Sequence, residues 1–131
     1  MIRKHILVPD RVRRPPREGW SWIDRRFLRE YASRLSHEAI VLYLFLAAVS
    51  DRNGLSFYSD ASVAVRLRMG EAAMVHARDE LVREDLVAYR APLTQVLSLP
   101  DRRHVERGGL MSLSEMFRVV TQSPRETGRQ P

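Results

Sequence analysis

The side chains with the most distinctive chemistry in this sequence are six basic residues near its N-terminus. They are Arg3, Lys4, Arg11, Arg13, Arg14 and Arg17. Guanidinium and ammonium groups bind phosphate through charge-assisted hydrogen bonds, and a dense group of them is typical of contact with nucleic acid. We therefore predict that this end of the chain contacts DNA, mainly through the phosphate backbone. The alternative is that the arginines solvate a flexible tail and pair with nearby acids.

The distribution of charge along the chain supports this emphasis on the N-terminal end. Residues 1–34 hold ten Lys or Arg against four Asp or Glu, whereas residues 35–100 hold six against eight. Residues 101–131 hold six against four, and the whole chain has a net charge of +6. The excess positive charge thus belongs to the two ends, and the middle is slightly acidic.

The elements that would position these charges begin with an arm. Residues 1–21 contain Pro9 and the pair Pro15-Pro16 and show no hydrophobic periodicity, which predicts an extended basic arm. Residues 6–8 could form a short strand. From residue 22 onward Ile23, Phe27, Tyr31 and Leu35 recur every four positions, so we expect a helix that turns them to one side. Arginines occupy its other faces.

The body of the chain alternates helices with short strands. A helix over residues 37–50, capped by Ser36, is apolar almost all round and is expected to be the central helix of the core. A turn at Asn53-Gly54 leads to the short strand LSFYS. Ser59 or Asp60 caps a helix to about residue 68, and Gly70 starts another to about residue 84. LVAYR and TQVLSL then read as a tight hairpin.

This order of elements is that of a winged helix. Over residues 35–99 the chain resembles the winged helix-turn-helix domains of plasmid and phage replication initiators and related bacterial DNA-binding regulators. The segments that carry the resemblance are AIVLYLFLAAV, DRNG, SFYSDASVAVRL, MVHARDEL and EDLVAY. We predict an α+β, mainly α fold: a winged helix-turn-helix domain with an N-terminal helical extension over residues 22–100, a basic arm before it and a C-terminal amphipathic helix after it.

The resemblance also assigns the two sides of the third helix. It implies a core made by Val63, Leu67, Met69, Met74, Ala77, Leu81 and Leu86. The positions that would face the major groove are Glu71, Ala72, Val75, His76 and Asp79. Of these only His76 is a strong donor to base edges, so we expect the third helix to recognise base sequence poorly. The family usually has a Ser or Thr cap and a basic pair where this chain has Gly70-Glu71-Ala72, which puts sequence reading in doubt.

Two further features follow from the same resemblance. Asp85 stands where the family usually has Gly before the wing, and Asp tolerates the left-handed backbone needed there. Arg66 and Arg68 flank the turn between the second and third helices, and Arg90 lies in the wing, all places that can touch phosphates. The predicted DNA-binding residues are therefore the six of the arm together with Arg66, Arg68, His76 and Arg90.

The C-terminal third has its own organisation. Residues 101–111 read as a linker with a Gly-Gly hinge, residues 112–121 as a short amphipathic helix, and residues 122–131 as a disordered tail. The apolar positions of that helix are Leu113, Met116, Phe117 and Val120. It could fold back on the domain, pair across a homodimer, or dock in the groove of a protein partner. Ala72 and Val75 are the other candidates for a protein contact.

Several classes of function are not expected. The four histidines are scattered, no phosphate-binding loop or nucleophile elbow occurs, and the chain has no cysteine. We expect no catalysis, no metal, no cofactor and no small-molecule substrate. The longest apolar run covers residues 39–49, too short for a membrane span, and the N-terminus lacks a secretory signal, so a cytoplasmic protein is expected.

Trp20 and Trp22 allow two interpretations. Exposed tryptophans among arginines stack on the bases of single strands, whereas Trp22, at a helix entrance, is expected to pack onto the core. The functional hypothesis is a non-catalytic DNA-binding protein of a bacterial plasmid or mobile element, accessory or initiator-like in replication, transposition or transcriptional control; this setting comes from the resemblance alone. The alternative is a winged-helix module for dimerisation or partner recruitment, without sequence-specific reading of DNA.

Overall fold

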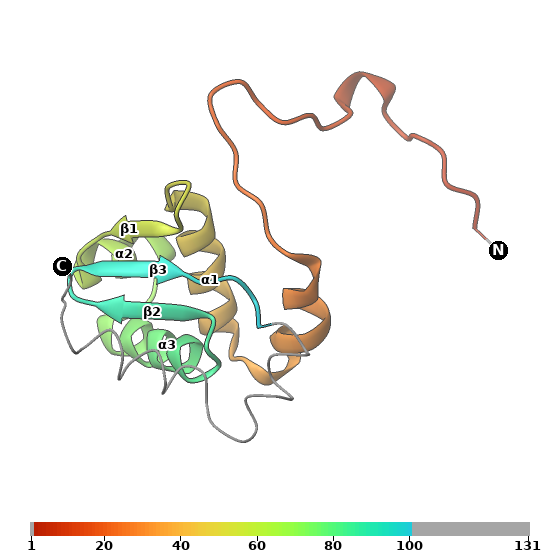
Figure 1. Ribbon diagram of the computed structural model, residues 1–131. Coiled ribbons are helices and arrows are strands. Elements are labelled where there is room, and N and C mark those ends of the chain that lie inside the picture. Colours follow the sequence, from red (N-terminus) through yellow and green to blue (C-terminus); the bar gives the residue numbers. More distant parts are fainter. Residues whose placement is uncertain (1, 101–131) are drawn as a thin grey trace, which may run out of the picture.

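The computed structural model describes residues 2–100, which form an extended arm followed by a small α+β domain (Figure 1). The predictions for residues 101–111, 112–121 and 122–131, including Leu113, Met116, Phe117 and Val120, lie outside the described residues. Within residues 2–100, no helix has both the length and the apolar character that crossing a membrane requires.

The domain is mainly helical and carries one small sheet. Its elements are α1 (His37–Val49), β1 (Leu55–Phe57), α2 (Asp60–Leu67), α3 (Glu71–Arg83), β2 (Val87–Arg90) and β3 (Leu93–Val96). An irregular helical segment, Phe27–Tyr31 and Ala32–Arg34, precedes them. The α+β, mainly α class and the order of helices and strands are thus confirmed, and the predicted bounds of α1, α2 and α3 agree with the structure to within about a residue.

The sheet has three antiparallel strands in the order β1-β3-β2. β3 pairs on one side with β1, where Leu55 lies opposite Gln95, and on the other with β2, where Val87 lies opposite Val96. The predicted hairpin is confirmed, and its two strands are joined at the cis Ala91-Pro92 peptide.

The core lies between the three helices and the sheet. α1 packs chiefly against α3. The largest fully buried side chains of the core are Leu42, Met74, Leu81, Leu86 and Val87. Of the core residues that the resemblance implied, five are buried, and Leu67 and Met69 pack half-buried against them. The hydrophobic pattern therefore predicted the inward faces of α2 and α3 correctly.

The ends of α2 and α3 are fixed by left-handed residues that are not glycine. Arg68 has φ 59° and ends α2, while the Met69 amide donates to the Ala64 carbonyl at 3.0 Å. Asp85 has φ 63° and ends α3, where the Leu86 amide donates to the Leu81 carbonyl at 3.0 Å. Both are Schellman endings, which satisfy the last carbonyls of a helix. The left-handed conformation predicted for Asp85 is confirmed; that of Arg68 was not predicted.

The turn between α1 and β1 depends on Gly54. Its φ is 84°, and a Cβ there would lie 2.5 Å from the Val96 carbonyl oxygen. The Asp51 carboxylate accepts hydrogen bonds from the amides of Asn53 and Leu55, at 2.8 and 3.0 Å. These two bonds lower the pKa of Asp51.

The segment before α1 joins the core through its aromatic side chains. Phe27 stacks on Tyr43 with ring centroids 4.0 Å apart, and Phe27, Tyr31 and Leu35 are buried as predicted. Ile23, predicted on the same face, precedes the helical segment and is 41% exposed. That part of the prediction is wrong because the helical backbone begins only at residue 25.

Three other expectations are corrected. Residues 6–8 form no strand, and a single 3₁₀ turn follows them at Pro9–Arg11. α1 is not covered all round, since Val41, Leu44 and Ala48 are exposed on the side away from the sheet. Trp22 does not pack onto the core: it is 72% exposed. Since no element lies over this side of α1 in the described chain, apolar composition alone overestimated its burial.

Candidate nucleic-acid interface

The six basic side chains of the arm are all exposed to solvent. The arm runs away from the domain (Figure 1), and its only acidic residues between positions 2 and 20 are Asp10 and Glu18. None of the ion pairs within residues 2–100 involves an arm residue. These charges are therefore available to an external polyanion.

Contacts at residues 21–26 fix the point where the arm leaves the domain. The Ser21 hydroxyl donates to the Ala48 carbonyl on α1 at 3.2 Å. Asp24 accepts from the backbone amide of Arg26 at 2.9 Å and from its Nη2 at 3.0 Å, and Arg26 also donates to the Pro100 carbonyl at 3.2 Å. The hydrogen bond from the Arg26 side chain is the main reason that the pKa of Asp24 is lowered. Arg26 is therefore a structural arginine.

The other predicted phosphate contacts lie elsewhere on the domain. Arg66 is near the end of α2, Arg68 forms the turn before α3, and Arg90 ends β2, and all three are exposed. The Arg66 guanidinium lies over the Tyr58 ring at 5.6 Å. The β2–β3 turn and the arm lie on opposite sides of the domain (Figure 1). The predicted DNA-binding residues thus fall into at least two separate groups.

The outward side of α3 carries the side chains predicted to face a groove. Glu71, Ala72, His76 and Asp79 are exposed, and Val75 is half-buried. His76 Nδ1 lies 3.6 Å from the Glu80 carboxylate, one turn along the same helix. Two carboxylates and one histidine give this surface little attraction for phosphate.

Glu80, next to that surface, is turned inward and joins α3 to α1. Its carboxylate accepts from the Ser36 amide at 2.9 Å and from the Ser36 hydroxyl at 2.5 Å, and its side chain is only 12% exposed. The same hydroxyl accepts from the Ala39 amide at 3.1 Å and so caps α1. Burial alone would raise the pKa of Glu80, but the hydrogen bonds from Ser36 outweigh burial and lower it.

Arg78 is the arginine of α3 that comes closest to the middle of the helix, and it is also turned inward. Its Nη1 donates to Asp60 at 2.8 Å, and its guanidinium lies 3.8 Å from the centroid of the Tyr89 ring. The side chain is 13% exposed. Arg78 therefore holds α2, α3 and β2 together, a role that its position in the sequence did not reveal.

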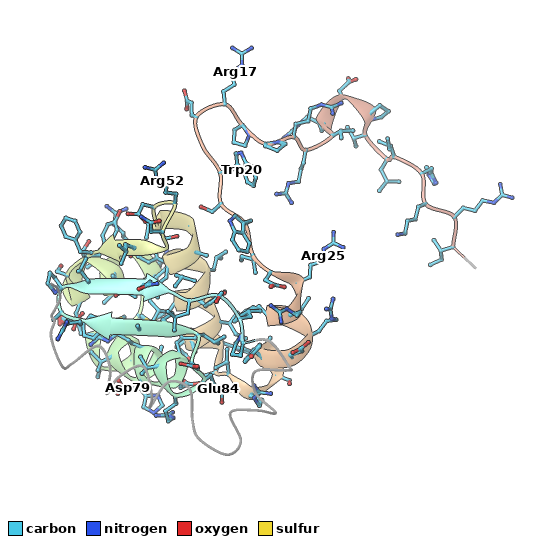
Figure 2. The ribbon with its side chains drawn as sticks, viewed as in Figure 1. Arg17, Trp20, Arg25, Arg52, Asp79 and Glu84 are labelled. Carbon is cyan, nitrogen blue, oxygen red and sulfur yellow. The ribbon has the colours of Figure 1, made fainter. Side chains whose placement is uncertain are left out.

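The structure brings together residues that sequence reasoning had not combined. Arg17, Trp20 and Arg25 lie along the arm and its junction with the domain, and Arg52 projects from the same end of the domain, whereas Asp79 and Glu84 lie at the opposite end (Figure 2). Arg52 belongs to the turn after α1, some thirty residues from the arm along the chain. Only the fold brings it to the same end of the domain as this junction (Figure 2), so no local pattern could have indicated it.

Within the described part of the chain, no three His, Cys, Asp or Glu side chains gather as a metal site would require. Comparison of the chain with protein-family models, curated proteins and solved structures finds no significant match.

Proposed function

We propose that this chain is a non-catalytic DNA-binding protein whose affinity comes mainly from the basic arm. The observation that carries the proposal is the arm itself, with six exposed cations and two acids over its length. Phosphate contacts of this kind supply affinity without base reading. The outward side of α3 supports the same division, because it offers His76 and two carboxylates where base-reading helices present basic or amide side chains.

We further propose that the domain acts as a winged helix. Support comes from the order of helices and strands, the sharp turn between α2 and α3, and the β2–β3 hairpin in the place of a wing. In this proposal Arg66, Arg68 and Arg90 add phosphate contacts, and His76 provides at most modest specificity. A role in replication, transposition or transcriptional control of a plasmid or mobile element rests on the resemblance over residues 35–99.

The two basic groups can act on one duplex because the arm is long. Residues 2–20 span at most about 65 Å when fully extended. An arm of this reach can follow the backbone or enter a minor groove beside a duplex that lies on any face of the domain.

The proposal is tested by removing residues 2–19 and measuring duplex binding by mobility shift at several salt concentrations. If each of the six cations neutralises one phosphate, the full chain has a log-log salt slope of about −5 or steeper. The truncated chain is expected to keep its fold and to lose most of its affinity and slope. A full-length variant with the six basic residues replaced by Gln controls for arm length. Undiminished binding by both variants would overturn the proposal.

A second candidate function, a protein-interaction module, is favoured by the small uncharged side chains at the start of α3. Ala72 is exposed and Val75 is half-buried beside it. Such a surface suits a flat contact with a second copy or another protein. Analytical ultracentrifugation of the Ala72→Glu variant tests it: loss of self-association with unchanged DNA affinity would favour the interaction module.

A further inference from the structure

The two tryptophans of the chain are both exposed at the junction between arm and domain. Trp20 is 63% and Trp22 is 72% exposed, and the sequence contains no other tryptophan. Tryptophan is highly buried on average in folded proteins, so two exposed ones separated by a single residue require an explanation. Packing of the described residues does not provide it.

Trp20 borders a groove on the uncovered side of α1. The groove has a volume of about 640 Å³, and Trp20 and Ile23 from the junction face Leu44 and Ala48 from α1 across it. Leu44 is 56% exposed. The hydrogen bond from Ser21 to Ala48 holds the two walls together. A groove of this volume, lined by both apolar and polar residues, has the size of sites that take small aromatic groups.

The charged side chains at this end of the domain are mostly arginines, although none of them lines the groove itself. Arg17 and Arg25 flank the tryptophans in sequence, and Arg52 projects from the turn at the end of α1 (Figure 2). Among the nearby acids, Asp24 is paired with Arg26, and Asp51 is held by backbone amides. Glu18 lines the groove itself and is the one carboxylate there. A carboxylate can accept a hydrogen bond from a base amino group, although it repels phosphate.

We propose that this junction binds single-stranded nucleic acid, with bases stacked on Trp20 and Trp22 and phosphates held by Arg17, Arg25 and Arg52. The inference rests on the proposed nucleic-acid function and names the strand class that this site takes. Duplex DNA keeps its base faces stacked inside the helix, so only an unpaired or opened strand can offer them to tryptophan. Aromatic rings set among cations are the usual means of binding single strands without reading their sequence.

A lipid surface fits the junction less well. Peripheral helices enter a membrane with a continuous apolar face, whereas the junction is an extended segment that carries Glu18 and Asp24 among its apolar side chains. Anionic vesicles are nevertheless the control that separates the two classes of partner.

The experiment uses the selectively excited tryptophan fluorescence of the full chain, because both tryptophans lie in the proposed site. Titration with oligo-dT of about 12 nucleotides, a length within the usual site size of single-strand binders, is expected to quench the emission. Affinity for this strand is expected to exceed affinity for a duplex of equal length at the same salt. Vesicles of mixed phosphatidylcholine and phosphatidylglycerol are expected to leave the emission unchanged.

Variants then assign the contact, with binding followed by the anisotropy of labelled oligo-dT. Trp20→Ala and Trp22→Ala are each expected to weaken binding about 5- to 160-fold, the range for loss of one stacked base. Trp20→Phe, which keeps an aromatic ring, is expected to restore most of the affinity. Phe57→Ala is the matched control, since Phe57 is 71% exposed on β1, and it is expected to bind like the unaltered chain.

Several results would overturn the inference. If the tryptophan variants bind oligo-dT as tightly as Phe57→Ala, the bases do not stack there. If in addition the chain binds duplex through its arm, the proposed function is supported and the single-strand site is rejected. If the chain binds neither nucleic acid, the proposed function and the single-strand site are both rejected. Quenching by the anionic vesicles but not by oligo-dT would assign the junction to a lipid surface. Loss of a dimer in Trp22→Ala, with no effect on oligo-dT binding, would assign it to a second copy.

Discussion

The arm and α3 both carry charged side chains, but they use them in different ways. In the arm, six cations are exposed and take part in no ion pair within residues 2–100. In α3, Arg78 and Glu80 are nearly buried and hold other elements in place. The titratable side chains that remain exposed on α3 are Glu71, His76, Asp79 and, at its last position, Arg83.

This difference shows that a charged residue has to be judged by what it already contacts. Three arginines, Arg26, Arg34 and Arg78, each form an ion pair with an acid of the same chain. Their charges are therefore less available to an external partner. The arginines of the arm have two acids near them and no fixed partner. Substitutions in the arm should therefore lower the affinity for nucleic acid without changing the free energy of unfolding. Substitutions at the inward positions of α3 should lower the free energy of unfolding without changing that affinity.

The largest effect on stability is expected from Arg78→Ala. The change removes the ion pair with Asp60 and the packing of the guanidinium on Tyr89, and it leaves Asp60 without its partner. We expect a loss of about 2–3 kcal/mol in the free energy of unfolding. Urea denaturation measures it. Arg83→Ala, at an exposed arginine of the same helix, is the control and should change stability by less than about 0.5 kcal/mol. Equal losses in the two variants would remove the distinction between inward and outward arginines.

A smaller effect is expected from pH, acting through Glu80. Because its pKa is lowered in the folded state, the carboxylate stabilises the fold above its ordinary pKa. That contribution is lost as the pH falls from about 4.5, the ordinary value, through the lowered one. Thermal melting between pH 6 and pH 3, measured for the full chain and for Glu80→Gln, should show a flatter acid decline in the variant. Asp79→Asn should follow the unaltered chain, and a matching decline in Glu80→Gln would show that other carboxylates dominate.

The smallest effect is expected from reversing a charge on the outward side of α3. In Asp79→Lys the exposed acid becomes a cation, yet the arm still supplies most of the phosphate contacts. We expect duplex affinity to change less than about threefold and the fold to be as stable as before. Mobility shift at low salt measures the change. A large gain would mean that α3 lies against the DNA backbone and that the arm is not the main contact.

The sequence was sufficient for most of the fold because its signals were local. Ser36 and Ser59 cap the helices they precede. The buried sides of α2 and α3 and the left-handed backbone of Asp85 were predicted through the resemblance, in which Asp85 takes the place of a glycine. Features of this kind are determined by residues close to one another in the chain, and the sequence shows those residues directly.

The features that were missed depend on contacts between distant segments. α1 is apolar on every side, so its sequence could not show that the side with Leu44 would stay uncovered. Trp22 is exposed as well, because no helix or strand of residues 2–100 covers it. Nothing in the sequence indicated the inward contacts of Arg78 and Glu80, because their partners Asp60 and Ser36 lie far away in the chain. For the proposed binding surface, the basic composition of the arm was evident from the sequence, and the position of Arg52 at the same end of the domain was not.

The strand order has a consequence for how the protein is made. β3 is the last of the three strands to leave the ribosome, yet it occupies the middle of the sheet. Until Leu93–Val96 emerge, β1 and β2 have no partner to join them, and both present unsatisfied strand edges to other nascent chains. The four residues of β3 thus pair with one edge of each strand at once, and the outer edges of β1 and β2 become the edges of the finished sheet.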